Sequence, residues 1–287
     1  MESQNVLLNL VQSDLAKGVV VQAQASSIIF KALPWINVNS NAYEYNVIND
    51  MPVPSFRDLG ENVIGASISP IKEVELLKIM SADVLTDRAL TLYQNINDIR
   101  AEQTGVAVDS MMQNYESLFF YGTGSMKDFK GLLPRLGVVG KEFNGTITGL
   151  KANVETEMEL LDQALDYVQG VRESGKGFIF VSPTTKRALN KLCRNGGVFD
   201  TVEAFGRSVL AYDGVPIIPI ESITGNEIFV CKFDEANGIS GLTCGGLKSE
   251  DMGMENVNYR TMVEMLCGVA VKHPRAFAVI RPKVKTK

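Results

Sequence analysis

The sequence predicts an α+β fold, and three patterns of apolar residues support this prediction. Strand-like alternation over residues 43–48 is followed by a second strand-like run over residues 71–79. A proline-free stretch over residues 85–118 has helical spacing, and strand patterns recur over residues 227–280. No linker, composition shift or internal repeat divides the chain, so we expect these elements to form one connected unit.

The composition is that of a soluble globular protein with an acidic balance. The 287 residues include 28 Lys and Arg against 33 Asp and Glu, which gives a net charge of −5 and excludes a globally basic nucleic-acid binder. Apolar residues make up 45% of the chain, yet no apolar run approaches the roughly 18 residues that a membrane-spanning helix needs. The polar, acidic start at residues 1–5 is unlike a secretory signal, so we expect synthesis in the cytoplasm.

Few residues of the chain are suited to metal binding or hydrolytic catalysis. The four cysteines are too far apart for a zinc knuckle or a redox pair, and we interpret them as buried free thiols. The one histidine, His273, precedes Pro274 between Lys272 and Arg275, which favours a strand or turn position over metal ligation. We therefore predict a protein with no catalytic residues, no metal site and no cofactor. The cysteines are Cys193, Cys231, Cys244 and Cys267.

The first 42 residues are interpreted as an arm. They contain a short helical pattern over residues 6–15 and a mixed stretch that ends at Pro34 and Trp35. The charges of the arm cancel, so it is unable to neutralise phosphates as a basic arm does. The strand at residues 43–48, the polar Pro-rich and Gly-rich stretch that follows it, and the returning run at residues 71–79 predict a long two-stranded excursion.

Two helices are expected in the middle of the chain. The first covers residues 85–118, weakened by about 1 kcal/mol at Gly105, and stops at the Gly-rich cluster of residues 122–125. That cluster lacks the Gly-Lys-Ser/Thr ending of a phosphate loop and follows a helix instead of a strand, so nucleotide binding there is not expected. The second helix covers residues 154–171, and we interpret the three carboxylates in its opening turns as favourable to the helix dipole: Glu155, Glu157 and Glu159.

A strand-to-helix unit and a set of closing strands complete the predicted elements. Residues 177–181 form a buried strand, and Ser182-Pro183 starts a helix over residues 184–192. A tight turn at residues 212–216 leads into an apolar run with two prolines, which suits an edge or twisted strand. Strands at 228–233, 260–271 and 276–280, with a Gly-rich loop through residue 246, are expected to form an antiparallel sheet.

Four segments in this order resemble the major capsid proteins of tailed bacteriophages, whose Hong Kong 97 fold is shared with encapsulin shells. In that family a spine helix ends in a Gly-rich turn followed by Gly-Leu, and a strand leads into a helix started by Pro. A Gly-x-Pro strand closes the inserted domain, and a strand preceded by a basic-Pro pair ends the chain. The segments are Glu116–Leu133, Phe178–Leu189, Leu210–Pro219 and Val269–Ile280.

The resemblance implies a division of the chain into four parts. These are an N-terminal arm over residues 1–42, an extended loop over residues 43–80 and an axial domain over residues 150–226. A peripheral domain would combine residues 81–149, which hold the spine helix, with the closing strands of residues 227–287. We expect the extended loop to lie on a neighbouring subunit, because two strands alone bury too little surface to be stable in water.

The function implied by the resemblance is that of a non-enzymatic shell protein. Copies of the chain would assemble into hexamers and pentamers of an icosahedral or prolate phage head, formed in the host bacterial cytoplasm and located in the virion capsid. The implied partners are other copies of the chain and a portal, with separate scaffold or decoration proteins as optional further partners. Double-stranded DNA would be enclosed and not tightly bound. We predict that the loop tip at Phe56, Arg57 and Asp58 makes the contacts between subunits.

Two other functions stay open from the sequence. An encapsulin-type compartment would use the same fold to enclose a cargo enzyme, and electron microscopy with identification of the contents separates it from a phage head. An α/β enzyme would use side chains around the Gly-rich turn, and a monomer or dimer in solution would favour it. The candidate residues for that enzyme are Glu116, Tyr121, Lys127 and Asp128.

Overall fold

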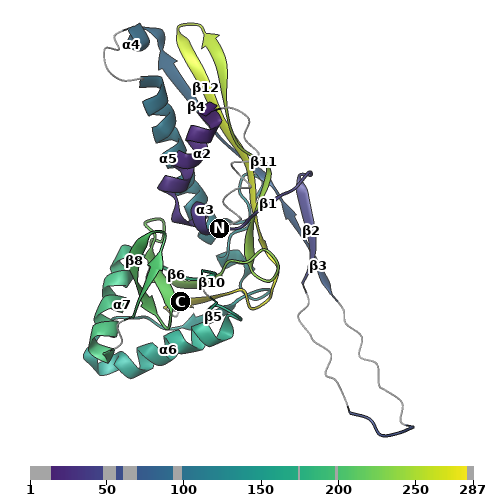
Figure 1. Ribbon diagram of the computed structural model, residues 1–287, viewed down its shortest axis with the longest axis vertical. Helices are drawn as coiled ribbons and strands as arrows, with labels where there is room; N and C mark the ends of the chain where they lie inside the picture. Colours follow the sequence, from purple (N-terminus) through teal and green to yellow (C-terminus); the bar gives the residue numbers. More distant parts are fainter. Residues whose placement is uncertain are drawn as a thin grey trace, which may run out of the picture.

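The computed structural model describes residues 14–47, 56–60, 70–92, 99–173, 175–197 and 200–282. It mixes helices and strands, which confirms the predicted α+β class. Figure 1 shows an elongated half built on the long helix α5 and the longest strands, and a second half that contains α6, α7 and the larger sheet. A two-stranded ribbon, β2 and β3, leaves the side of the molecule.

The described part of the N-terminal segment packs onto the body. It forms α2 (Asp14–Ser26), α3 (Ile28–Ala32) and β1 (Trp35–Asn37), so the helix predicted over residues 6–15 lies mostly outside the described residues. The Ser27 hydroxyl caps α3 by accepting a hydrogen bond from the Phe30 amide. Phe30 and Trp35 are buried in the main core, and β1 pairs in parallel with β11.

The helix predicted from residue 85 begins later than expected. Residues 78–87 form the strand β4 (Lys78–Asp87), which follows β3 (Ile71–Leu76), and the short helix α4 (Arg88–Leu92) comes next. The long helix α5 covers Ile99–Tyr121, with Gly105 inside it. The prediction was wrong over residues 85–87, which belong to β4 and where Leu85 fits a helical spacing by chance, whereas residues 88–92 are helical in α4. Inward and outward side chains alternate along β4, as they must in a strand that pairs with β12 over its whole length.

The larger sheet has the strand order β5-β13-β10-β6-β9-β8-β7. Its centre is made of fully or nearly fully buried strands: β6 (Gly177–Val181), β10 (Ile228–Lys232) and β13 (Phe277–Arg281). Two helices pack on it, α6 (Val154–Tyr167) and α7 (Pro183–Gly196), and Ser182 caps α7 as predicted. The remaining strands are β5 (Lys141–Asn144), β7 (Asp200–Ala204), β8 (Arg207–Tyr212) and β9 (Val215–Pro219).

The strand with two prolines is internal, so of the two predicted alternatives, an edge strand or a twisted strand, the edge is wrong. β9 pairs in parallel with β6 on one side and with β8 on the other. Its pairing with β8 covers only the two positions next to the turn, Ala211 with Pro216 and Tyr212 with Val215. Pro219 lies beyond that short ladder and pairs on one side, with Val181 of β6, whereas Pro216 lies within the ladder to β8. The tight turn between β8 and β9 is confirmed, with positive φ at Asp213 and Gly214.

The closing strands divide between two sheets, so the predicted single antiparallel sheet was wrong. β11 (Ile239–Glu255) and β12 (Asn258–Val271) belong to a four-stranded sheet of order β1-β11-β12-β4, whereas β10 and β13 belong to the larger one. The predicted Gly-rich loop is part of β11 from residue 239 onward. Gly241 has a packing role there, because a Cβ at this position would lie 2.7 Å from the Trp35 ring.

We predict that truncation of Phe30 destabilises the whole subunit. Phe30 is 1% exposed and its ring lies 4.9 Å from the Trp35 ring, so Phe30→Ala should lower the free energy of unfolding by about 3–5 kcal/mol. Val21 on α2 is exposed, and Val21→Ala is the matched control with an expected change within about 0.5 kcal/mol. Urea unfolding followed by circular dichroism measures both. Equal midpoints for Phe30→Ala and Val21→Ala would contradict a structural role for this segment.

Candidate functional site

The ribbon of β2 (Ala42–Val47) and β3 is a separate two-stranded sheet. Its register runs from Ala42 opposite Leu76 to Val47 opposite Ile71, which confirms the predicted strand pair. Residues 48–55 and 61–69, which belong to the predicted excursion, lie outside the described residues. An isolated two-stranded ribbon is marginally stable in water, so this arrangement needs a further contact to be stabilised.

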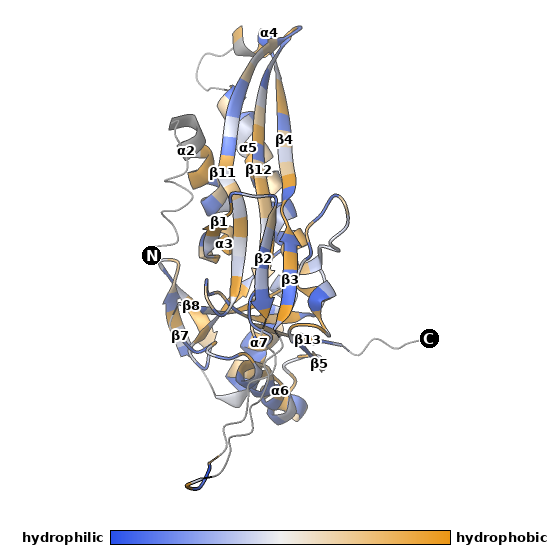
Figure 2. Cartoon of the chain, turned by 90° about the vertical axis from the view of Figure 1, so that its right-hand side faces the viewer, coloured by the Kyte–Doolittle hydropathy of each residue, from blue (hydrophilic) through white to orange (hydrophobic). Residues whose placement is uncertain are grey.

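The tip of the excursion presents apolar side chains to solvent. Phe56 is 105% exposed and Leu59 is 107% exposed, and Arg57 and Asp58 lie between them in the sequence. Figure 2 shows this short segment with hydrophobic and hydrophilic residues side by side, away from the body of the molecule. The three residues predicted to make subunit contacts are consecutive in the chain, and the structure adds exposed Leu59, which follows them directly and which the sequence analysis missed.

A buried ion pair joins the ribbon to the body. Arg135, at the end of the 3₁₀ turn η1 (Leu133–Arg135), is 2% exposed and its Nη1 contacts Glu75 of β3. Its other donors reach three backbone carbonyls: Nε donates to Gly131 at 3.2 Å, and Nη2 donates to Lys130 at 2.8 Å and to Val269 at 2.9 Å. Every nitrogen of the guanidinium group therefore has a partner.

Tyr45 connects the second strand of the ribbon to the same ion pair. Its hydroxyl donates to Glu75 Oε1 at 3.2 Å and accepts from the backbone N–H of Val271 at 3.3 Å. Burial, followed by the nearby negative charge of Glu75, raises the pKa of Tyr45 to about 12. We refer to Arg135, Glu75 and Tyr45 as the clasp.

The clasp was not predicted from the sequence. One signal was present, because Arg135 follows Leu132 and Leu133 and precedes Leu136, and a single charge in an apolar run is a candidate for burial. The sequence contains no indication of which carboxylate it would meet, since Glu75 is 60 residues away.

The four residues proposed for an enzyme do not form a catalytic group. Buried Glu116 accepts a hydrogen bond from Ser27 Oγ at 2.7 Å, and burial raises its pKa. The Tyr121 hydroxyl donates to Glu227 at 2.6 Å. Lys127 is exposed on the turn after α5. Glu116 is thus hydrogen-bonded to the residue before α3, and Tyr121 to the residue before β10.

The fourth of these residues, Asp128, explains the Gly-rich turn after α5. Its carboxylate accepts the backbone N–H groups of Thr123 at 2.8 Å and Ser125 at 2.7 Å, and these bonds with the two hydroxyls hold its pKa well below the ordinary range. The amides that a phosphate would need are therefore occupied by the chain's own carboxylate, in agreement with the prediction against nucleotide binding. Gly122 is required because a Cβ would lie 2.3 Å from the carbonyl oxygen of Phe129.

Two of the carboxylates predicted at the start of α6, Glu155 and Glu157, lie in its first turn, and Glu157 has a further role. Glu157 is buried and accepts the backbone N–H groups of Thr148 at 3.0 Å and Gly149 at 2.8 Å, so it fixes the loop before the helix. Glu155 lies in the first turn, as the dipole interpretation requires.

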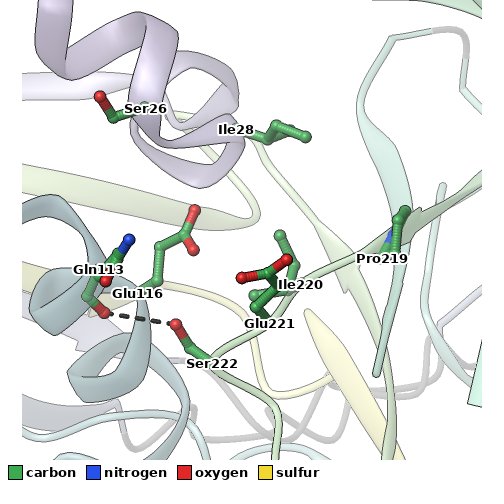
Figure 3. A pocket seen from close by; sticks show the side chains of 8 residues that line it. All are labelled: Ser26, Ile28, Gln113, Glu116, Pro219, Ile220, Glu221 and Ser222. Atoms are coloured by element: carbon green, nitrogen blue, oxygen red, sulfur yellow. Dashed lines mark hydrogen bonds between the residues drawn. The ribbon is translucent and has the colours of Figure 1, made fainter. Parts of the chain in front are cut away.

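The described surface has two hollows large enough to hold a small molecule. One, of about 350 Å³, lies between α3, α5 and the residues after β9, and Figure 3 shows the carboxylates of Glu116 and Glu221 pointing into it. The other, of about 570 Å³, is a groove between β4, α5 and the turn that holds Met126. Neither contains a nucleophile next to a base among the residues that line it: Ser222, in the first, donates only to the Gln113 carbonyl, at 3.3 Å.

The cysteines and His273 have structural positions. Cys193, Cys231 and Cys267 are buried free thiols as predicted, whereas Cys244 is half-buried, and burial raises the pKa of Cys267 to about 12. His273 lies between β12 and β13, where its Nδ1 accepts the Arg275 amide at 3.1 Å and burial lowers its pKa. Within the described ranges, no three metal-binding side chains gather and no helix is long and apolar enough to cross a membrane.

Comparisons with known proteins place this geometry among viral and bacterial shells. No protein-family model and no curated protein sequence matches the chain. Solved structures do match. The holo-SrpI encapsulin complex from Synechococcus elongatus PCC 7942 has 22% identity and a TM-score of 0.69, over 90% of this chain and 88% of that one. The capsid of a native GTA particle has 12% identity and a TM-score of 0.63, over 96% and 92% of the two chains.

A phage capsid shows the same likeness. The capsid structure of the cyanophage P-SCSP1u has 13% identity and a TM-score of 0.57, and the match covers 88% of this chain and 86% of that one. The chain has the Hong Kong 97 capsid fold. This result confirms the fold that the four motif segments implied.

We predict that Tyr45 makes the subunit sensitive to alkali. Its pKa of about 12 lies above the ordinary value of 10.0, so the neutral hydroxyl supports the folded state fully below pH 10, and this support is lost as the pH rises toward 12. The wild-type protein should therefore lose more unfolding free energy than Tyr45→Phe between pH 10 and 12. Urea titrations across that range measure the difference, and parallel losses in the two proteins would refute this role of Tyr45.

Proposed function

We propose that this chain is the major capsid protein of a tailed bacteriophage. Copies assemble into hexamers and pentamers that form an icosahedral or prolate head in the bacterial cytoplasm, and the head encloses double-stranded DNA. The observation that carries the proposal is the exposed apolar tip at Phe56 and Leu59, presented on a marginal ribbon by a fold that capsids use.

The energetics of the tip favour contact with another subunit. An exposed Phe or Leu side chain gains roughly 1.5–3 kcal/mol when it is fully buried, and the tip offers one of each. We propose that the tip contacts a different part of the neighbouring subunit, which makes the contact head-to-tail. Such a head-to-tail contact generates a closed ring when the rotation between copies closes, which is how one sequence forms hexamers and pentamers.

The charge of the chain favours a shell that encloses DNA without binding it tightly. Counterion release requires clustered Lys and Arg, and neither the net charge of −5 nor the charge-balanced arm supplies such a cluster apart from the short basic run at residues 281–287. A separate motor and a portal would therefore bring the genome into the head. The side chains proposed for catalysis are used within the fold, as described above, and this supports a structural and not an enzymatic role.

A second candidate is an encapsulin-type compartment shell. The encapsulin complex has a higher TM-score and identity than the GTA and cyanophage capsids, and this observation favours it. The GTA and cyanophage capsids cover 96% and 88% of this chain, against 90% for the encapsulin complex, and the two functions differ in what the shell encloses and not in how the subunit folds.

Electron microscopy of particles purified from producing cells tests the proposal. We expect closed shells that contain double-stranded DNA protected from added nuclease, because the genome is enclosed. Shells that contain a co-purified protein and no protected DNA would contradict the phage-head function and support the encapsulin function. A monomer or dimer in size-exclusion chromatography, with no shells at any concentration, would contradict both functions.

We predict that the tip controls assembly without controlling folding. Phe56→Ala combined with Arg57→Glu removes the exposed aromatic ring and reverses one charge, so shell yield should fall strongly while the subunit stays soluble and folded. Sedimentation measures the shell yield, and circular dichroism measures the fold.

The matched control for this variant is an exposed apolar residue away from the ribbon. Val106 on α5 is 64% exposed, and Val106→Ala should leave both the yield and the fold unchanged. An unchanged shell yield for the tip variant would show that the tip makes no contact that assembly needs.

A further inference from the structure

We propose that the clasp of Arg135, Glu75 and Tyr45 is a positioning device that sets the direction in which the ribbon leaves the body. By this means it sets the angle at which one subunit presents its tip to the next. The second statement rests on the proposed shell function, whereas the first concerns the subunit alone.

Apart from the clasp, the ribbon is held by a small attachment. A satellite apolar cluster lies at its base, separate from the two large core clusters. Leu77, Leu242 and Ala270 are buried in it, and partly buried residues that include Tyr43 and Tyr45 of β2 pack against them. The Leu77 amide donates to the Asn41 carbonyl across the base at 2.8 Å, and the Lys272 ammonium lies 5.3 Å from the Tyr43 ring. In the part of the chain that the structure describes, the two strands of the ribbon pair with each other and with no other strand. Such a base keeps the ribbon attached and leaves its direction weakly defined, because apolar contacts are non-directional.

The clasp supplies the missing direction. The guanidinium group is planar, and two of its nitrogens are fixed by carbonyls of two body elements, the turn at Lys130 and Gly131 and the strand β12 at Val269. The donor that remains, Nη1, points to Glu75 on β3. Since a charged hydrogen bond weakens steeply when it is bent, Glu75 is tied to one position.

Tyr45 adds a second point of attachment on the other strand. Its hydroxyl joins Glu75 to the backbone N–H of Val271 on β12. β2 and β3 are therefore each fixed to the body by one side chain, and two fixed points prevent the ribbon from rotating about a single contact. Both β12 partners, Val269 and Val271, are buried, so this part of the body is rigid.

A buried ion pair is suited to direction more than to stability. Bringing two charges out of water offsets most of their attraction, and two apolar residues of similar volume often give equal stability. What the apolar residues do not reproduce is the defined geometry of the hydrogen bonds. If the ion pair has a positioning role, apolar replacements should keep the stability of the subunit and lose the direction of the ribbon. If its role is only to stabilise the fold, they should leave the direction unchanged.

The test measures the direction of the ribbon with two spin labels. One label is placed at Ile71→Cys on β3 and one at Val106→Cys on α5, both exposed, in a background with Cys244→Ser because Cys244 is the half-buried thiol. Labelled subunits are assembled with an excess of unlabelled subunits, so that distances within one subunit are recorded. The same measurement is made on unassembled subunits. We expect a single narrow distance for the wild-type protein.

The decisive variant is the double replacement Arg135→Met with Glu75→Leu. It removes both charges together, so the thermal unfolding temperature should stay close to that of the wild type while the narrow distance is lost. The matched control, Arg281→Met with Glu142→Leu, removes a bidentate ion pair of the larger sheet and should keep the narrow distance. If the double variant fails to fold, the same distance is measured in Tyr45→Phe, which removes the hydroxyl that joins Glu75 to β12. Tyr43→Phe on the same strand is the control for this variant.

The outcomes separate the two statements of the proposal. Loss of the narrow distance in folded clasp variants, but not in the controls, supports the clasp as a positioning device, and an unchanged narrow distance overturns it. Shells of mixed diameter or open sheets from the clasp variants support the link to assembly, and uniform shells overturn that link. If the wild-type protein forms no shells, the proposed function fails, while the distances in unassembled subunits still decide the role of the clasp.

Discussion

The charge of Arg135 is the constraint on which the arrangement of the ribbon depends. A guanidinium group that is 2% exposed must find partners for all of its donors, since an unpaired buried charge costs several kcal/mol. The turn after α5, the strand β12 and the strand β3 are held around it because each supplies one of those partners. One side chain therefore connects the turn after α5, the four-stranded sheet and the ribbon.

The rest of the subunit follows from a different principle, the burial of apolar surface. α5 packs between the N-terminal helices and both sheets, and its aromatic residues Tyr115, Phe119 and Phe120 are fully buried. This core is large and non-directional, so it stabilises the body without determining where the ribbon points. The subunit thus has a rigid body whose fold is set by packing and an attached ribbon whose direction is set by polar contacts.

Local patterns predicted the elements whose signals lie within a short segment. α6, α7, β6 and the turn at Asp213 were found because periodicity, a capping serine or a turn residue marks each of them. β11 and the extent of β4 were missed, because glycines needed for packing against Trp35 look like loop residues and a few strand positions also fit helical spacing. The clasp was missed for a third reason, since its partners meet only in the tertiary structure.

A shell gives the ribbon's direction a consequence that an isolated subunit lacks. In a head-to-tail ring, the rotation from one copy to the next is set by where the tip of one subunit meets the body of another. The ribbon acts as a lever, so a small change of angle at its base moves Phe56 and Leu59 by a larger distance at the tip. A ring of five needs a larger rotation per subunit than a ring of six, so both rings together require a direction that is defined yet able to shift between a few values. Directional hydrogen bonds at the base define the direction of the ribbon, and the small apolar attachment lets this direction shift. A large apolar core under the ribbon would hold one direction and would not let it shift.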